Sequence, residues 1–381
     1  MIDVRNFDEI RPFRDEEVNG VLMKLLENPS FRNLASLFYP EMPLEDIKKI
    51  FSGIRSLREF QEKVTYIVLK KILGKSSSEI SCIGFEILEK GKAYLFISNH
   101  HDIVLDPSIL NVLLFEKGFN TTKIAIGDNL LHNEWIRTVA RLNKSFIVHR
   151  NTSFKHGYYI SQRLSNFIRK SLLDDRESVW IAQREGRAKD GNDVTQVSLL
   201  KMLAYGGDED SFEYLKSLNI IPVSISYEFD PCDILKVREL IEKEKNKHYR
   251  KSPEDDVISM SMGLRGNKGR IHATIGKIID EEFDQIVQHE SQRVQFQALA
   301  ALIDEQIQTN IRLWPSNYIA YDLLLNRENH SDLYSGEDQD VFKSYIEKRL
   351  SDSHLDNPDA RTKILSIYAN PVKNKLRYTG F

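Results

Sequence analysis

A histidine and a carboxylate lie close together after an apolar run near residue 100. His101 and Asp106 are five positions apart and follow the apolar segment 94–98. An apolar strand that ends in a polar elbow places such side chains at its carboxyl end, where α/β folds usually hold their ligands. Across the elbow, the carboxylate could fix the imidazole tautomer while the other ring nitrogen takes up a proton. We therefore predict that His101 is a general base and that Asp106 orients it.

The same residues also fit a purely structural role. Asp106 suits the cap of a helix, and Pro107 suits its first turn. In that interpretation His101 is only a loop residue, and the adjacent His100 leaves the choice of histidine open. A metal site built from His100, His101 and Asp102 is disfavoured, because neighbouring residues rarely face one ion and no second cluster of ligands follows. We expect no metal and no bound cofactor.

The elements that position this elbow are short apolar runs alternating with helical stretches. The apolar runs are 93–98, 122–127, 144–149, 178–183 and 220–229, and the clearest helical patterns are 107–118 and 154–173. Such alternation is typical of an α/β fold, and we expect a central mixed sheet with crossover helices. The stretch 261–279 resembles a hairpin whose turn is Gly266–Gly269.

Helical regions are expected on both sides of the α/β domain. We divide the chain into an N-terminal helical region 1–80, a catalytic α/β domain 81–290 and a mostly helical extension 291–381. Apolar residues from 57 to 72 have helical spacing, Gly74 is a plausible stop, and the end is basic, with Lys70, Lys71 and Lys75. This helix could face a core or lie on a membrane surface. In the extension, one apolar stripe contains Phe296, Leu299, Ile303 and Ile307.

Composition narrows the class of protein. The 381 residues carry a formal net charge of −3, so a general nucleic-acid binder is disfavoured and we expect no nucleic-acid partner. Two cysteines cannot build a disulfide framework, which favours a reducing cytoplasm. The acidic, polar N-terminus is no signal peptide, and no apolar run is long enough to span a bilayer. We expect a cytoplasmic protein that contacts the inner face of the membrane peripherally.

Three further sequence blocks follow the His/Asp pair. They are Gly-Asp-Asn-Leu at 127–130 with Phe-Ile-Val-His-Arg at 146–150, then 180–191 around Glu-Gly-Arg, and finally Ile-Pro-Val-Ser-Ile-Ser-Tyr-Glu at 221–228. In this order the blocks resemble the glycerolipid acyltransferase superfamily, whose first motif is His-(four residues)-Asp. The resemblance is closest to the glycerol-3-phosphate and dihydroxyacetone-phosphate acyltransferase branch, and it covers roughly residues 93–280. No Gly-x-Ser-x-Gly nucleophile elbow is present, which argues against a serine hydrolase.

The resemblance implies a role for individual residues. By the four-residue spacing, His101 and Asp106 are the catalytic pair, although Asn99 is followed by two histidines here. Arg150 would grip the acceptor's phosphate. Beside it the third block would contribute Glu185 and Gly186, with either Arg187 or Lys189 as the cation, because the family's arginine lies between these two positions. Pro222, in the fourth block, would support the acyl-donor side.

The resemblance also implies a fold and a reaction. The fold would be similar to that of glycerol-3-phosphate acyltransferase. The reaction would move a fatty acyl group from acyl-CoA or acyl carrier protein to a hydroxyl of glycerol 3-phosphate or lysophosphatidic acid, in phospholipid biosynthesis. The thioester is then a substrate rather than a cofactor. Three alternatives stay open: a lyso-aminolipid acceptor, a thioesterase or lysophospholipase using the same pair, and a catalytically silent binding protein. Acceptor-dependent turnover would separate them.

Overall fold

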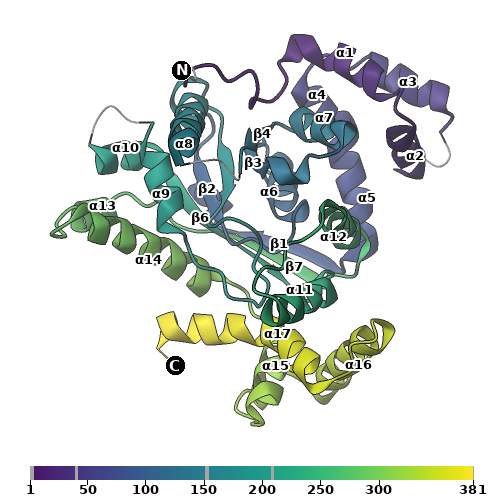
Figure 1. The fold of residues 1–381 in the computed structure, drawn as a ribbon, viewed down its shortest axis with the longest axis vertical. Coiled ribbons are helices and arrows are strands. Elements are labelled where there is room, and N and C mark those ends of the chain that lie inside the picture. The colour runs from purple at the N-terminus through teal and green to yellow at the C-terminus, as the bar shows by residue number, and fades with distance from the viewer. Residues whose placement is uncertain (1–3, 39–41, 151–153, 207–209, 381) are drawn as a thin grey trace.

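A sheet of seven strands lies at the centre of the protein (Figure 1). The computed structural model describes residues 4–38, 42–150, 154–206 and 210–380. β6 and β7 pair antiparallel, and all other neighbouring strands pair parallel, so β1 and β7 run opposite to the other five. This mixed sheet confirms the predicted fold class. In spatial order the strands are β1 (Glu79–Ile83), β7 (Arg270–Ile275), β6 (Ile220–Tyr227), β2 (Leu95–Ser98), β5 (Val179–Ala182), β3 (Lys123–Gly127) and β4 (Ser145–Val148).

Both faces of the sheet are covered, which explains why the central strands are continuous apolar runs. Side chains alternate between the two faces of a strand. Leu95 and Ile97 of β2 therefore join one core, while Phe96 joins the other. Helices on the first face are α8 (Phe154–Arg169), α9 (Val197–Ala204), α10 (Ser211–Ser217), α13 (Glu282–Ile286) and α14 (Gln292–Asn310). The second face is covered mainly by α6 (Leu105–Glu116).

The N-terminal region is helical and ends in a long irregular helix. Its elements are α1 (Asp15–Leu25), α2 (Pro29–Phe38), α3 (Leu44–Ser52), α4 (Leu57–Phe60), the π-helical turn η1 (Gln61–Thr65) and α5 (Tyr66–Ser76). Phe60, Val64 and Leu73 are buried, so the helix faces a core along most of its length. The prediction that Gly74 ends the helix is wrong. The glycine has no atom near the position of a Cβ and lies inside α5, where it costs some stability without breaking the helix.

The predicted hairpin at 261–279 is wrong. Its first arm belongs to helix α12 (Pro253–Arg265), which begins at a capping box formed by Ser252 and Asp255. The expected turn connects this helix to β7. β7 pairs instead with β6 and β1, two strands that are distant in the sequence. α12 passes very close to the elbow after β2, because a Cβ at Gly263 would lie 2.0 Å from Asp102 Oδ2.

The C-terminal extension contains α14 and three more helices. Phe296, Leu299, Ile303 and Ile307 are all buried against the sheet, which confirms the predicted stripe on α14. The other helices are α15 (Pro315–Leu325), α16 (Gly336–Asp352) and α17 (Pro358–Thr379), and they share a core with α11 (Asp233–Lys245). Together with α7 (Glu134–Leu142), these complete the α-helices of the described chain. Within the described ranges, no helix is both long and apolar enough to cross a bilayer.

Candidate active site

The elbow after β2 is fixed by Asn99. Its buried side-chain amide exchanges two hydrogen bonds of 2.9 Å with the backbone of Ile225 in β6: Nδ2 donates to the carbonyl, and Oδ1 accepts from the N–H. The side chain thus continues the pairing of β2 with β6 after the two backbones separate. The chain is then free to turn, and the next residues come back over the carboxyl end of the sheet.

Asp106 is the centre of the elbow. Its carboxylate is fully buried, and Oδ2 accepts from His100 Nδ1 at 2.9 Å and from the backbone N–H groups of His101 and Asp102 at 2.7 and 3.0 Å. Oδ1 accepts from the Tyr227 hydroxyl at 2.7 Å. Burial opposes ionisation, but these bonds, led by the one from His100, lower the pKa of Asp106 below its usual value. Asp106 is therefore a buried, ionised anchor.

The structure assigns the imidazole partner of Asp106 to His100 and not to His101. The expected hydrogen bond between the His101 imidazole and Asp106 is not formed, while the choice of the catalytic base stays a prediction. His101 contributes only its backbone N–H to Asp106, and its ring lies against Tyr227, with centroids 6.2 Å apart. Since Asp106 accepts from Nδ1 of His100, Nε2 is the nitrogen with a free lone pair. That arrangement is what a general base requires.

The prediction that Asp106 caps a helix is also corrected. α6 begins at Leu105, and Asp102 Oδ1 accepts from the backbone N–H groups of Val104 and Leu105 at 2.9 and 2.8 Å. Asp102 therefore satisfies the first turn of α6. This leaves the Asp106 carboxylate free to hold His100.

His101 is a neutral side chain, and its titration should make stability depend on pH. Burial, with the nearby charge of Lys236, lowers the pKa of His101 to about 4 from its usual 6.5. The unfolded chain then binds a proton more readily, so this stability is complete above pH 6.5 and is lost as the pH falls toward 4. The full loss is about 3 kcal/mol.

We expect His101→Gln to flatten the pH dependence of the free energy of unfolding in this window, measured by urea denaturation at pH values between 4 and 7. The exposed His289 provides the matched control, His289→Gln. An unchanged slope in His101→Gln would contradict the assignment.

Arg150 and Glu185 come together at the same edge of the sheet, as the order of the blocks suggested. Arg150 follows β4, and its backbone N–H donates to Asp128 Oδ1 at 3.2 Å. Its guanidinium lies 3.6 Å from Glu185, which is exposed. Gly127 makes this approach possible, because a Cβ there would be 2.6 Å from Arg150 Nε. An exposed ion pair of this length is weak and can open for a ligand.

Arg187 and Lys189 differ in whether their charges are already paired. Lys189 forms a 2.8 Å ion pair with Glu239, which Lys251 also contacts at 3.0 Å. The Arg187 side chain is buried, yet its Nη1 has no hydrogen-bond partner within the described chain. A buried, unsatisfied guanidinium costs stability unless a ligand completes it. Of the two cations left open by the sequence, Arg187 is the one available to an anion.

The loop that carries Arg187 offers more donors. Gly186 has φ +75°, a left-handed conformation that favours glycine. In the described structure no acceptor binds the backbone N–H groups of Gly186 and Arg187. In contrast, the N–H groups of His100, His101 and Asp102 are all taken by carboxylates. The loop at 186–187 therefore offers unbonded donors for an oxyanion, which these three N–H groups do not.

Pro222 lies inside the sheet rather than at its edge. It is buried in β6 opposite Ile97 of β2, and its carbonyl accepts from the Gly276 N–H at 2.8 Å. Its predicted connection with the acyl donor stays a prediction.

Two site residues were not singled out from the sequence. Tyr227 is the last residue of β6, four positions past Val223, which pairs with the last residue of β2. Asp193 accepts from the His100 N–H at 2.8 Å, and burial raises its pKa to about 6. No local pattern marks Asp193, because it lies in an irregular segment.

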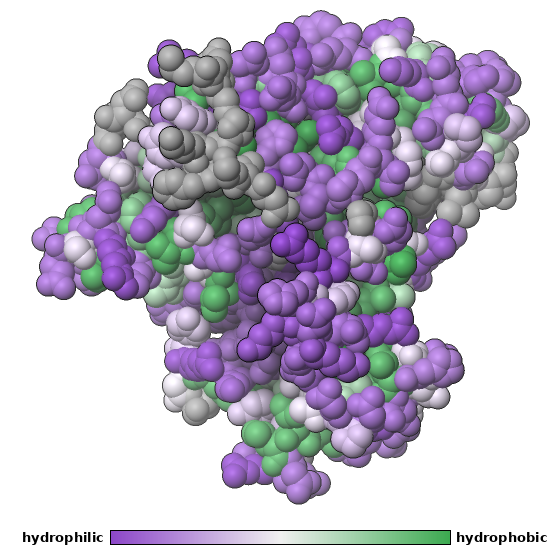
Figure 2. Space-filling model, viewed as in Figure 1, coloured by the Kyte–Doolittle hydropathy of each residue, from purple (hydrophilic) through white to green (hydrophobic). Residues whose placement is uncertain are grey.

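A large apolar cavity begins beside the elbow. It has a volume of about 1450 Å³ and is enclosed by η1, α5, α6, α7 and α12. Ile103 and Val104 of the elbow are part of its wall. Elsewhere on the face drawn in Figure 2, the surface is largely hydrophilic and apolar residues form separate patches. The lining of this cavity suits an elongated apolar ligand. Other wall residues are Phe60, Val68, Val112, Trp135 and Met260.

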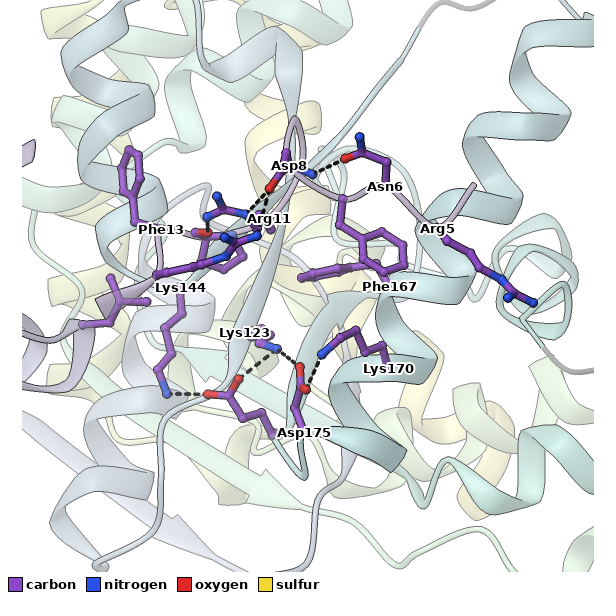
Figure 3. A pocket seen from close by; sticks show the side chains of 15 residues that line it. Arg5, Asn6, Asp8, Arg11, Phe13, Lys123, Lys144, Phe167, Lys170 and Asp175 are labelled. Atoms are coloured by element: carbon purple, nitrogen blue, oxygen red, sulfur yellow. Dashed lines mark hydrogen bonds and ion pairs between the residues drawn. The ribbon is translucent and has the colours of Figure 1, made fainter. Parts of the chain in front are cut away.

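A second cavity, of about 540 Å³, lies at the opposite end of the strands (Figure 3). Lys123 and Lys144 line it, at the starts of β3 and β4, and both form ion pairs with Glu177. Lys170 is paired with Asp175. These lysines thus already have carboxylate partners, and the cavity lies away from the His100 elbow.

Comparison with known proteins agrees with this geometry. Residues 79–225 match the family model described as Acyltransferase. This part of the chain is thus similar to the acyltransferase family. The matched segment includes His100, Asp106, Arg150 and Arg187 but ends before Tyr227 and the C-terminal extension.

Beyond the family model, likenesses to individual proteins are weak. No curated protein matches this chain. Among solved structures, the chain is similar to the 1-acyl-sn-glycerophosphate (LPA) acyltransferase PlsC from Thermotoga maritima, with 13% identity and a TM-score of 0.36. The similarity covers 76% of this chain and 94% of that one.

Proposed function

We propose that this protein transfers a fatty acyl group from a thioester to a hydroxyl of a glycerol-phosphate-type acceptor during phospholipid synthesis. The family match supports acyl transfer. The observation that carries the finer proposal is the combination of the Asp106–His100 dyad with Arg187, whose buried Nη1 has no hydrogen-bond partner in the described chain. The two are linked directly, since the N–H of Ala188, the next residue, donates to the His100 carbonyl at 2.8 Å.

In the proposed reaction, His100 Nε2 takes the proton of the acceptor hydroxyl as its oxygen attacks the thioester carbonyl. Asp106 stabilises the imidazolium that forms. The tetrahedral intermediate then collapses, the carbon–sulfur bond breaks, and the imidazolium returns its proton to the leaving thiolate. The N–H groups of Gly186 and Arg187, which have no acceptor in the described structure, would serve as donors either for the oxyanion or for the acceptor's phosphate.

Substrate positioning follows from the surroundings of the dyad. Arg187 would bind the acceptor's phosphate with its planar donor fork, and Arg150 would assist from β4 once its weak contact with Glu185 opens. The acyl chain would occupy the apolar cavity that begins at Ile103 and Val104. Glycerol 3-phosphate and lysophosphatidic acid both present a phosphate near a free hydroxyl and fit this arrangement.

The test is thiol release by the purified protein from acyl-CoA and from acyl carrier protein, with and without each acceptor. We expect release that depends on glycerol 3-phosphate or lysophosphatidic acid, together with formation of the acylated product. Release of equal rate without any acceptor would instead indicate a thioesterase that activates water through the same dyad. Release stimulated only by an acceptor that lacks phosphate would contradict the role given to Arg187.

A further inference from the structure

The loop from Arg184 to Asp193 contacts the backbone of His100 on both sides. Ala188 donates its N–H to the His100 carbonyl at 2.8 Å, and the His100 N–H donates to Asp193 Oδ2 at 2.8 Å. The position of His100 therefore depends on this loop. The loop also carries Arg187, so one irregular segment places both the dyad and the phosphate-binding group.

The opposite side of this loop is held by α17, in the C-terminal extension. Asn370 Nδ2 donates to the Asp190 carbonyl at 2.6 Å. Asn374, which is buried, donates from Nδ2 to the Gly191 carbonyl at 3.3 Å and to Asn192 Oδ1 at 3.2 Å. Two side-chain amides, one helical turn apart, thus satisfy acceptors of an irregular loop that has no strand partner of its own.

The backbones of the loop and α17 also approach each other closely. Gly191 has φ +79°, and a Cβ there would lie 2.4 Å from the carbonyl oxygen of Ile367. Only glycine fits this position without displacing one of the two segments. The loop and α17 can therefore pack this closely only with glycine at position 191.

α14 and the rest of the extension support the same loop. Gln308 Nε2 donates to the Asp193 carbonyl at 3.2 Å, and Asp304 accepts from Thr195 Oγ1 at 2.6 Å. α17 is itself fixed to the catalytic region, because the Tyr368 hydroxyl donates to the buried Asp233 at 2.9 Å. A rigid path therefore runs from the extension through the loop to His100.

We propose that the C-terminal extension is a working part of the active site, and that Asn370 and Asn374 are positioning residues for acceptor binding and for His100. The effect on acceptor binding rests on the proposed acyl transfer. The support of the loop by α17 rests on the contacts alone. The extension lies outside the segment that matches the acyltransferase family. α17 supports the loop at 186–193 from outside that segment. In the described structure, the carbonyls of residues 190 and 191 accept hydrogen bonds from no other helix.

The test compares Asn370→Ala/Asn374→Ala with the matched control Ser366→Ala, whose hydroxyl bonds only to Thr362 of its own helix. Amide hydrogen exchange is measured on the full-length proteins, alongside the steady-state constants for acceptor and donor. We expect exchange of the bonded loop amides of Ala188 and Asn192 to accelerate roughly tenfold in the double variant, with β2 and β6 unchanged. We also expect the acceptor KM to rise roughly tenfold and the donor KM to stay constant, because the acyl cavity lies away from this loop.

Two results would overturn the proposal: unchanged exchange of the loop in the double variant, or a looser loop with unchanged acceptor kinetics. If the double variant loses its global fold, Asn370→Ala alone, at the half-buried position, is measured in the same way. If the wild-type protein transfers no acyl group to any acceptor, the proposed function fails while the exchange measurement still decides whether α17 holds the loop.

Discussion

Replacing His100 by alanine is expected to lower kcat for acyl transfer by about 10²–10⁴-fold, with little change in either KM. The imidazole of His100 is the one that Asp106 holds, through Nδ1 at 2.9 Å. The substitution leaves the backbone untouched, so the N–H of residue 100 still donates to Asp193 and the elbow is retained. The loss should therefore appear in the chemical step and not in substrate binding.

His101→Ala is the matched control, because it removes an adjacent imidazole of the same size. His101 supports Asp106 only through its backbone N–H, which alanine also provides. We expect kcat to fall by less than about tenfold, which is the effect of a repacked neighbour rather than a lost base. The measurement is steady-state thiol release at saturating donor and acceptor. Activity that survives His100→Ala and disappears in His101→Ala would return the base to His101, where the spacing of the family motif had placed it.

The second large effect is expected at Arg187. Arg187→Leu should raise the acceptor KM by about 10–100-fold, because hydrogen bonds to charged groups each contribute about 1.5–3 kcal/mol. The donor KM should not change, since the apolar cavity does not include this side chain. Arg187→Lys keeps the charge but loses the planar fork, so an intermediate acceptor KM is expected.

Stability should respond very little to the same substitution. Arg187 Nη1 is buried without a partner, so removing it relieves one cost of folding, while nearby carboxylates raise the pKa of Arg187 and favour its charge, so the two effects oppose each other. The carboxylates whose charges act on Arg187 have partners of their own: Asp230 binds Lys236, Asp256 binds Lys251, and Asp102 accepts from Val104 and Leu105. The free energy of unfolding should therefore change by no more than about 1 kcal/mol. The exposed Arg250 gives the control, Arg250→Leu. An unchanged acceptor KM in Arg187→Leu would refute this role for Arg187.

The central sheet could be predicted because its strands are buried on both faces. A run such as 93–98 is continuously apolar, and few other structures tolerate it. β1 was not recognised, since its residues are only partly buried and lack a clear pattern. β7 was assigned to a hairpin because a Gly-rich tetrapeptide precedes it, and sequence alone did not show that a helix ends there.

Within the helical extension, the bounds of α15, α16 and α17 were not predicted, because distant polar contacts stabilise these helices. Asp233 is fully buried at the start of α11 and accepts from Tyr345 and Tyr368, more than a hundred positions away, with Arg349 as its ion-pair partner. Such a cluster leaves no periodic signal in the local sequence. These helices are thus held in place partly by contacts with Asp233, a residue of another helix, which the local sequence does not reveal.

For the site, the sequence indicated the elbow but not which imidazole Asp106 binds. Residue types and order could be compared with a family, and they gave Asp106, Arg150 and the loop around Arg187. Spacing counts residues along the chain, whereas the partner of Asp106 is decided by the direction of each side chain after the turn. That direction depends on Asn99 holding β6, a contact between residues 126 positions apart.

The position of β1 at the edge of the sheet has a consequence for synthesis of the chain. β1 pairs only with β7, and Ser81 and His272, which contact each other across this pair, are 191 positions apart. During translation β1 therefore leaves the ribosome long before its partner β7 is made. The edge of β6 that pairs with β7 also stays unpaired until then. Closing so distant a contact is slow, and unpaired edges promote association with other chains. A nascent chain stopped before residue 270 would expose both edges, so completion of the sheet is a late event on which solubility depends.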